Sequence, residues 1–256
     1  MNDRALQDLV IRALADAPFR RSPEWRQRAL ADPDRVEQFA RFLARHYYFE
    51  RIVHFFKYSA ALSGITGRRP EAVLGQPSFD ALRPALVLGS RDSARTVAAL
   101  VVAHVKSGRP SAPIPYHADL LRYEESMMVV EAGPRVWRER ENGERKTDDA
   151  APQTVAGTEL LDLTYDLPTV LPQLLRPWTA VPEAPVRPVR LIIARSRYGR
   201  VAVAKATDAI VSIMDLADGR KTLEDLAREA GLRPAELQAT LQGLTELGAV
   251  RFSTGG

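Results

Sequence analysis

The chain has 256 residues, of which 45% are hydrophobic, and it carries a formal net charge of +4 and no cysteine. The apolar share is enough to bury a core, while the lack of cysteine excludes disulfide bonds and thiolate metal ligands. The first residues are charged from Asp3 on and contain no apolar signal region, so we expect a soluble, cytoplasmic protein with no membrane partner. The positive charge is arginine-rich and dispersed, which favours an acidic protein partner over nucleic acid.

The N-terminal part of the sequence predicts an all-helical domain over residues 1–135. Apolar residues at helical spacing predict firm helices at 4–16, 90–105 and 116–132 and shorter ones at 24–30, 70–74 and 79–88. The longest predicted helix covers 36–62, because this segment contains neither proline nor glycine.

The apolar side of this long helix changes along its length. Val36, Phe39, Leu43 and Tyr47 form one apolar side in the first half, but His46, Glu50 and His54 continue that side in the second half. Either the helix kinks near Tyr47 or different neighbours cover it along its length. We favour different neighbours, with part of the helix contacting another subunit. The predicted partner interface consists of Arg45, Tyr48, Arg51, Ile52 and Phe56, or of the side that carries His46, Glu50 and His54.

The C-terminal part predicts a small antiparallel sheet. Residues 136–157 are charged and weakly apolar, and we interpret them as a linker before a second domain at 158–256. Residues 158–166 alternate like a strand, and 177–188 form a proline-rich connector. A hairpin follows, with arms at 189–199 and 200–206 and its turn at Tyr198–Gly199.

Three short helices and a closing strand end the chain. Apolar spacing and caps predict helices that end at Gly219, Gly231 and Gly248, and the last is followed by a strand at 249–252. This outline is typical of a winged helix, which binds either DNA or peptide. From Thr207 on, five basic and eight acidic residues give a charge of −3, and the third helix presents Glu236 and Glu246 outward. A DNA-reading helix needs Arg or Lys at such positions, so we set DNA binding aside.

The sheet and the three helices together resemble the PqqD-like domains that recognise precursor peptides in the biosynthesis of ribosomally made, modified peptides. The resemblance runs from Leu191 to Val250 and is best over 207–214 and 218–227. It implies that a leader peptide adds as a strand to the edge of the sheet, beside the third helix. We predict that the edge strand is 200–206, unless 158–166 or the proline-rich connector covers it. The predicted peptide-binding residues are Val201, Val203, Lys205, Leu237, Gln238, Leu241 and Thr245.

No set of residues in the sequence predicts catalysis. His46, Glu50 and His54 are spaced four apart and invite a metal hypothesis, but the paired Glu-x-x-His pattern of di-iron bundles is missing, so we favour a solvated or interface side. Glu124 and Glu125 follow Arg122, and ion pairing explains them more simply than acid–base chemistry. We therefore predict no catalytic residue and no metal ligand in this chain.

Taken together, the chain resembles the partner subunits of multinuclear non-haem iron-dependent oxidative enzymes, of the 3-thiaglutamate and methanobactin type. The N-terminal share of the resemblance rests on residues 39–51, 86–91 and 117–125. It implies a non-catalytic subunit that binds a precursor leader and docks on an iron enzyme, so that the iron lies in the partner. The fold class is then α+β, with an N-terminal helical domain and a winged-helix-like domain of three strands and three helices. A transcriptional regulator with a helical sensor domain and a stand-alone metalloenzyme using His46, Glu50 and His54 remain as alternatives.

Overall fold

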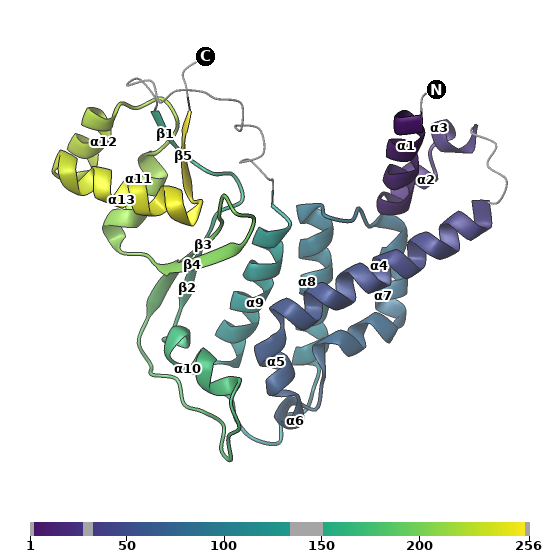
Figure 1. Ribbon diagram of the computed structural model, residues 1–256. Helices are drawn as coiled ribbons and strands as arrows, with labels where there is room; N and C mark the ends of the chain where they lie inside the picture. Colours follow the sequence, from purple (N-terminus) through teal and green to yellow (C-terminus); the bar gives the residue numbers. More distant parts are fainter. Residues whose placement is uncertain (1–2, 28–32, 134–150, 254–256) are drawn as a thin grey trace. The chain divides into compact units, whose positions relative to one another are not determined.

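The computed structural model describes residues 3–27, 33–133 and 151–253, and it is a mixed α+β structure with small antiparallel sheets (Figure 1). The chain divides into two compact units. Unit 1 comprises Met1–Ala132 with Leu171–Pro182, and unit 2 comprises Gly133–Val170 with Glu183–Gly256. The segment Leu171–Pro182 therefore groups with the helical unit, although the predicted boundaries placed it in the C-terminal domain. No helix in the described part of the chain is long and apolar enough to cross a membrane.

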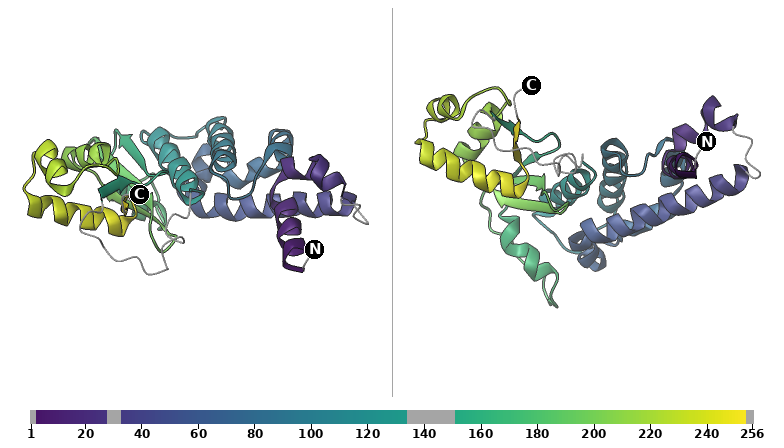
Figure 2. Two further views of the ribbon diagram at one scale, coloured as in Figure 1. Left: turned by 90° about the horizontal axis from the view of Figure 1, so that it is seen from above. Right: turned by 45° about the horizontal axis from the view of Figure 1, so that its top comes forward.

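Unit 1 is built from helices. They are α1 (Asp3–Ala15), α2 (Ala17–Arg20), α3 (Pro23–Arg26), α4 (Pro33–Phe55), α5 (Lys57–Ala61), α6 (Ser63–Thr66), the 3-10 helix η1 (Pro70–Gly75), α7 (Pro77–Leu82), the 3-10 helix η2 (Arg83–Ala85), α8 (Arg91–Lys106) and α9 (His117–Glu131). The Ser90 side chain caps α8 by accepting a hydrogen bond from the Ser93 amide. Helices α8 and α9 lie side by side in each view (Figures 1 and 2). The predicted helix at 79–88 is shorter than expected, because Pro84 falls in η2 rather than in a continuing α-helix.

Helix α4 does not kink at Tyr47 but continues to Phe55, and a short break at Phe56 separates it from α5. Its buried side consists of residues at roughly fourfold spacing, namely Ala40, Ala44, Tyr48, Ile52, Phe55 and Phe56. The predicted apolar side in the first half was partly wrong: Val36, Leu43 and Tyr47 are half-buried, but Phe39 is half exposed. Small alanines let neighbouring helices such as α1 approach closely, and this leaves the larger side chains outside.

Unit 2 contains two antiparallel sheets. Strands β2 (Glu159–Leu163), β3 (Val189–Arg195) and β4 (Val201–Lys205) form one sheet in that order, and Gly199 has φ +77° in the β3–β4 turn. Strands β1 (Ala151–Thr154) and β5 (Val250–Ser253) form a separate pair. Part of the predicted linker 136–157 is thus strand β1, while 136–150 lie outside the described residues.

The remaining helices of unit 2 are α11 (Asp208–Leu216), α12 (Leu223–Ala230) and α13 (Pro234–Leu247), and α10 (Leu167–Leu174) is shared between the two units. Thr207 and Thr222 cap α11 and α12. One core joins these three helices to β3 and β5, and it contains Ile192, Ala194, Ile213, Met214, Leu226, Ala227, Leu237, Leu241, Leu244, Ala249 and Val250. Gly248 ends α13 with φ +89°, at a point where the backbone of β3 passes close by.

Candidate functional site

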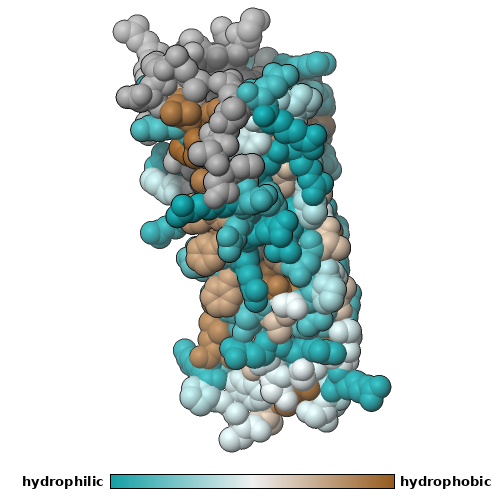
Figure 3. Space-filling view, turned by 90° about the vertical axis from the view of Figure 1, so that its right-hand side faces the viewer, coloured by the Kyte–Doolittle hydropathy of each residue, from teal (hydrophilic) through white to brown (hydrophobic). Residues whose placement is uncertain are grey.

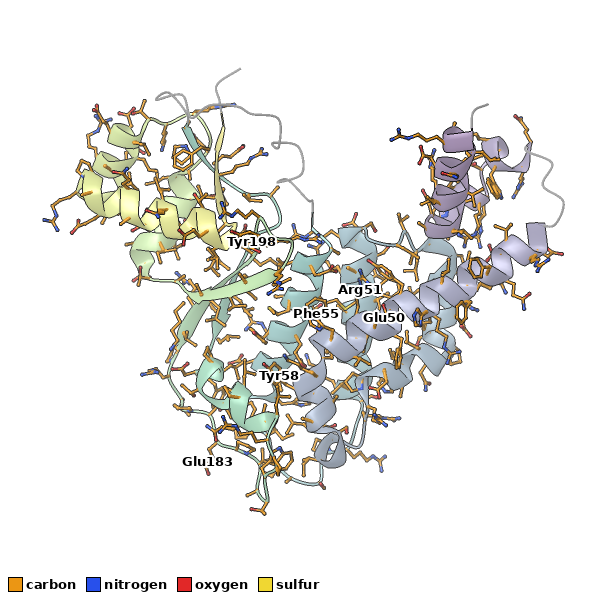
Figure 4. The ribbon with its side chains drawn as sticks, in the orientation of Figure 1. Glu50, Arg51, Phe55, Tyr58, Glu183 and Tyr198 are labelled. Carbon is orange, nitrogen blue, oxygen red and sulfur yellow. The ribbon has the colours of Figure 1, made fainter. Side chains whose placement is uncertain are left out.

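Strand β4 is an edge strand, as predicted. In the described part of the chain it pairs only with β3, and β2 lies on the far side of β3. The turn at its start contains Tyr198, which is mostly exposed (Figure 4). An exposed edge leaves one row of amides and carbonyls available to another chain.

The hydrogen bonds of the hairpin show which residues point their backbone outward. Ser196 N donates to Arg200 O and Ala206 N donates to Arg190 O, so these two pairs are hydrogen-bonded positions of the ladder. Such positions alternate in antiparallel pairs. Ala202 and Ala204 therefore bond to β3, whereas the N–H and C=O groups of Val201, Val203 and Lys205 face the free edge.

The side chains of β4 point alternately to the two faces of the sheet, and those of Val201, Val203 and Lys205 do not point toward α13. Ala204 packs on the core that contains Ile192, Ala194, Leu237 and Leu241, so the even-numbered residues face α13. Val201, Val203 and Lys205 lie on the other face of the sheet. The predicted groove between these three side chains and α13 was therefore wrong: their backbones line the edge, but their side chains point away from α13.

The predicted residues of α13 have different positions. Leu237 and Leu241 are core residues, because both are fully buried under the sheet. Gln238 is exposed, and Thr245 is half-buried with its hydroxyl donating to Leu241 O at 2.8 Å. Ala202 and Ala204 are only half-buried. These two small side chains form the accessible part of β4 on its α13 face. The hydropathy pattern did not identify them as candidate binding residues.

Lys205 makes an internal ion pair. Its Nζ lies 3.1 Å from Oδ2 of Asp166, a carboxylate with no exposed side-chain surface, and Arg187 donates to the same oxygen. The hydrogen bond from Arg187 holds the pKa of Asp166 below its usual value. Asp166 N also bonds to Pro185 O. The end of β4 is thus tied to the loop after β2 and to the proline-rich connector.

The predicted partner interface on α4 is partly wrong. Tyr48, Ile52 and Phe56 are fully buried within the chain and offer no surface to a partner. Arg51 lies over the Tyr47 ring, 3.4 Å from its centroid, and its Nε lies 3.3 Å from Glu131 of α9 (Figure 4). Arg45 is exposed, as an interface residue must be. The change of apolar side along α4 therefore reflects where the core lies, and not a partner interface. The exposed side of α4 is the one that carries His46 and Glu50.

The three residues of the metal hypothesis are only loosely associated. His46 Nε2 lies 3.3 Å from Glu50 Oε1, and both side chains are more than half exposed. The ring of His54 meets Phe55 edge-on at 4.7 Å. Among the residues that the structure describes, no three His, Asp or Glu side chains are grouped closely enough to hold a metal ion.

Glu124, for which the sequence favoured ion pairing, is a buried acid. Its Oε1 accepts hydrogen bonds from Tyr58 N at 2.8 Å and Ser59 N at 3.1 Å, and the Ser59 hydroxyl donates to Oε2. Burial raises the pKa of Glu124 to about 8. The ion-pair interpretation was wrong for this residue. Its position in the apolar stripe, four residues after Leu120 and four before Met128, was the signal that could have identified it.

Comparisons with known proteins add no relative. No protein-family model matches the chain, and no curated protein is significantly similar to it.

Proposed function

We propose that unit 2 binds an extended peptide by strand addition at the free edge of β4. The observation that carries this proposal is the outward direction of the amides and carbonyls of Val201, Val203 and Lys205 on an edge strand. Main-chain hydrogen bonds from such an edge supply affinity for many peptide sequences, and neighbouring pockets supply register. Ala202 and Ala204 leave room on the α13 face for larger side chains of an added strand.

The biological peptide in this proposal is the leader of a ribosomally made precursor. The order of a three-stranded sheet, three helices and a closing strand resembles that of PqqD-like domains, and this resemblance supports the choice. The exposed polar residues of α13 are Glu236, Gln238, Gln242 and Glu246, and this acidic surface disfavours a phosphate backbone. The chain then acts as a non-catalytic subunit that presents the precursor to a non-haem iron oxidative enzyme, with the iron in that enzyme.

Proline substitutions test the outward and the β3-bonded amides of β4 one at a time. Val203→Pro removes an outward amide and leaves the ladder to β3 intact, whereas Ala202→Pro removes an amide that bonds to β3. We expect Val203→Pro to weaken leader binding by about tenfold or more with little change in Tm, because a hydrogen bond is lost and the ring obstructs the added strand. We expect Ala202→Pro to lower Tm.

The measurement is fluorescence anisotropy of a labelled synthetic leader peptide, with thermal unfolding of each variant. Val203→Ala is the matched control, since it shortens the same side chain and keeps the amide. Folded Val203→Pro protein that binds the leader like the wild type would refute strand addition at β4.

A further inference from the structure

Lys205, the last residue of β4, uses only part of its hydrogen-bonding capacity within the chain. Its Nζ lies 3.1 Å from Oδ2 of Asp166, yet 52% of the Lys205 side chain is exposed. In the described part of the chain the ammonium group makes this one hydrogen bond, although it carries three N–H donors. Two donors therefore remain for another partner at the end of the free edge.

The charges around Asp166 do not cancel. Arg187 donates to the same oxygen as Lys205, so two positive charges meet one negative charge and leave a balance of +1. The second carboxylate oxygen, Oδ1, is buried and accepts no hydrogen bond from the described residues. The second cation is thus not placed to satisfy the open acceptor of Asp166, and its charge is available to a ligand.

The geometry of the sheet places this charge on one face. Lys205 lies opposite Leu191 of β3, on the face turned away from α13. The next residue of β3, Arg190, lies on the α13 face and pairs there with Asp162 and Asp208. These two carboxylates are therefore on the other side of the sheet from Lys205, and they do not remove its charge.

A strand added to β4 would meet a fixed sequence of side chains on this face. Side chains of neighbouring strands lie next to each other on a common face, and Val201, Val203 and Lys205 occupy every second position of β4. The two valines are half-buried, whereas Lys205 is exposed. Apolar exposure alone would select little, since Figure 3 shows apolar side chains among hydrophilic ones elsewhere on the protein. The lysine is the feature that distinguishes one extended peptide from another.

We infer that β4 selects extended peptides that carry an acidic residue opposite Lys205 and apolar residues opposite Val203 and Val201. This inference rests on the proposed strand addition at β4 and names the peptide class that it takes. The acidic residue then stands two and four positions from the apolar ones. It precedes them in a peptide antiparallel to β4 and follows them in a parallel one. Lys205 is thus a specificity-determining residue.

The peptide class is read from a phage-displayed library of random decapeptides, selected on the immobilised full chain. We expect the enriched peptides to share an acidic residue with apolar residues two and four positions away. We also expect folded Val203→Pro protein to lose these peptides, because its proline obstructs the added strand.

The role of Lys205 is measured with one enriched peptide and its copy in which the acid is replaced by the matching amide. In fluorescence anisotropy the wild type should bind the amide peptide about threefold more weakly, since an exposed ion pair contributes little. Lys205→Gln should bind both peptides alike, and Lys205→Arg should keep the preference. Lys205→Gln leaves Arg187 on Asp166, so no buried carboxylate is left unpaired. The matched control is Arg95→Gln, which removes one exposed positive charge from α8 and should keep the preference.

The possible failures are distinguishable. A library that yields no enriched peptide, or peptides that folded Val203→Pro binds as well as the wild type, overturns strand addition at β4 and this inference with it. Enriched peptides that depend on β4 but share no acidic residue overturn this inference alone, and that result needs no variant of Lys205. A preference for the acid that persists in folded Lys205→Gln also overturns it.

Discussion

The buried carboxyl of Glu124 makes the stability of the chain depend on pH in an unusual direction. Its pKa rises from 4.5 to about 8 on folding, so the folded state holds a proton that the unfolded state releases above pH 4.5. Below that pH both states are protonated and the contribution of Glu124 to stability is complete. As the pH rises through the folded pKa that contribution is lost, and the loss levels off above it.

The size of this effect follows from the shift. A shift of roughly three to four pKa units corresponds to about 5 kcal/mol between pH 4 and pH 9, an upper value for a group that can relax when it ionises. Tyr58 and Tyr123 lie near the carboxyl, but burial raises both of their pKa values, that of Tyr123 to about 12, so neither titrates in this window. The positive charge of Lys57 favours the ionised carboxyl and reduces the effect.

Glu124→Gln removes the titration and keeps the shape. The glutamine oxygen can still accept from Tyr58 N and Ser59 N, and its amide can donate to the Ser59 hydroxyl. We expect the variant to gain stability relative to the wild type as the pH rises from 5 to 9, by up to about 5 kcal/mol. Urea unfolding of both proteins at pH 5, 7 and 9 measures the difference. A wild-type-minus-variant difference that is the same at all three pH values would refute the reasoning, because other titrating groups cancel in it.

Three further substitutions test the backbone and the electrostatics of unit 2. Gly248→Ala should lower the free energy of unfolding by more than about 2 kcal/mol, since the added Cβ would collide with the Arg195 carbonyl. Gly231 also has a positive φ, +67°, but nothing lies within 4 Å of an added Cβ, so Gly231→Ala should lower the free energy of unfolding by only about 1 kcal/mol. Thermal unfolding of both variants measures the difference. Asp166→Asn should lower Tm at pH 7, because Arg187 and Lys205 lose their shared carboxylate. The pKa of Asp166 is depressed, so the wild-type advantage should be present above pH 4 and be lost as the pH falls through the folded pKa of Asp166; an advantage that does not shrink at all on acidification from pH 7 would show that charge is not its source.

Local signals in the sequence predicted the elements of unit 2 well. Gly231 and Gly248 end α12 and α13 where the sequence placed the helix ends, and the hairpin turn contains Gly199. The sequence could not predict which β4 residues turn their backbone N–H and C=O groups to the free edge. Periodicity shows which residues alternate, but not which backbone groups bond to the neighbouring strand. Only the register with β3 decides that Val203 faces the edge and Ala202 does not.

Unit 1 was harder to predict because its main helix buries small residues. Hydropathy favours Phe39 over Ala40 as a core residue, yet Ala40 is buried and Phe39 is exposed. The choice depends on how closely α1 and other neighbours approach, which is a property of the tertiary structure. Glu124 is the same kind of case, since its partners at Tyr58 and Ser59 are about 65 residues away in the sequence.

The division of the chain has a practical consequence for dissecting it. Neither unit is a continuous piece of sequence, because Leu171–Pro182 belongs with unit 1 although it lies between β2 and β3 of unit 2. A fragment that starts at Gly133 would carry Leu171 and Leu174, both buried in the whole protein, without the helices they are grouped with. A fragment that stops at Ala132 would lose the Pro182 carbonyl that accepts from the Tyr116 hydroxyl at 2.9 Å. Cutting the chain once between its units therefore damages both, and a faithful peptide-binding fragment of unit 2 needs a short replacement for 171–182 rather than a new first residue.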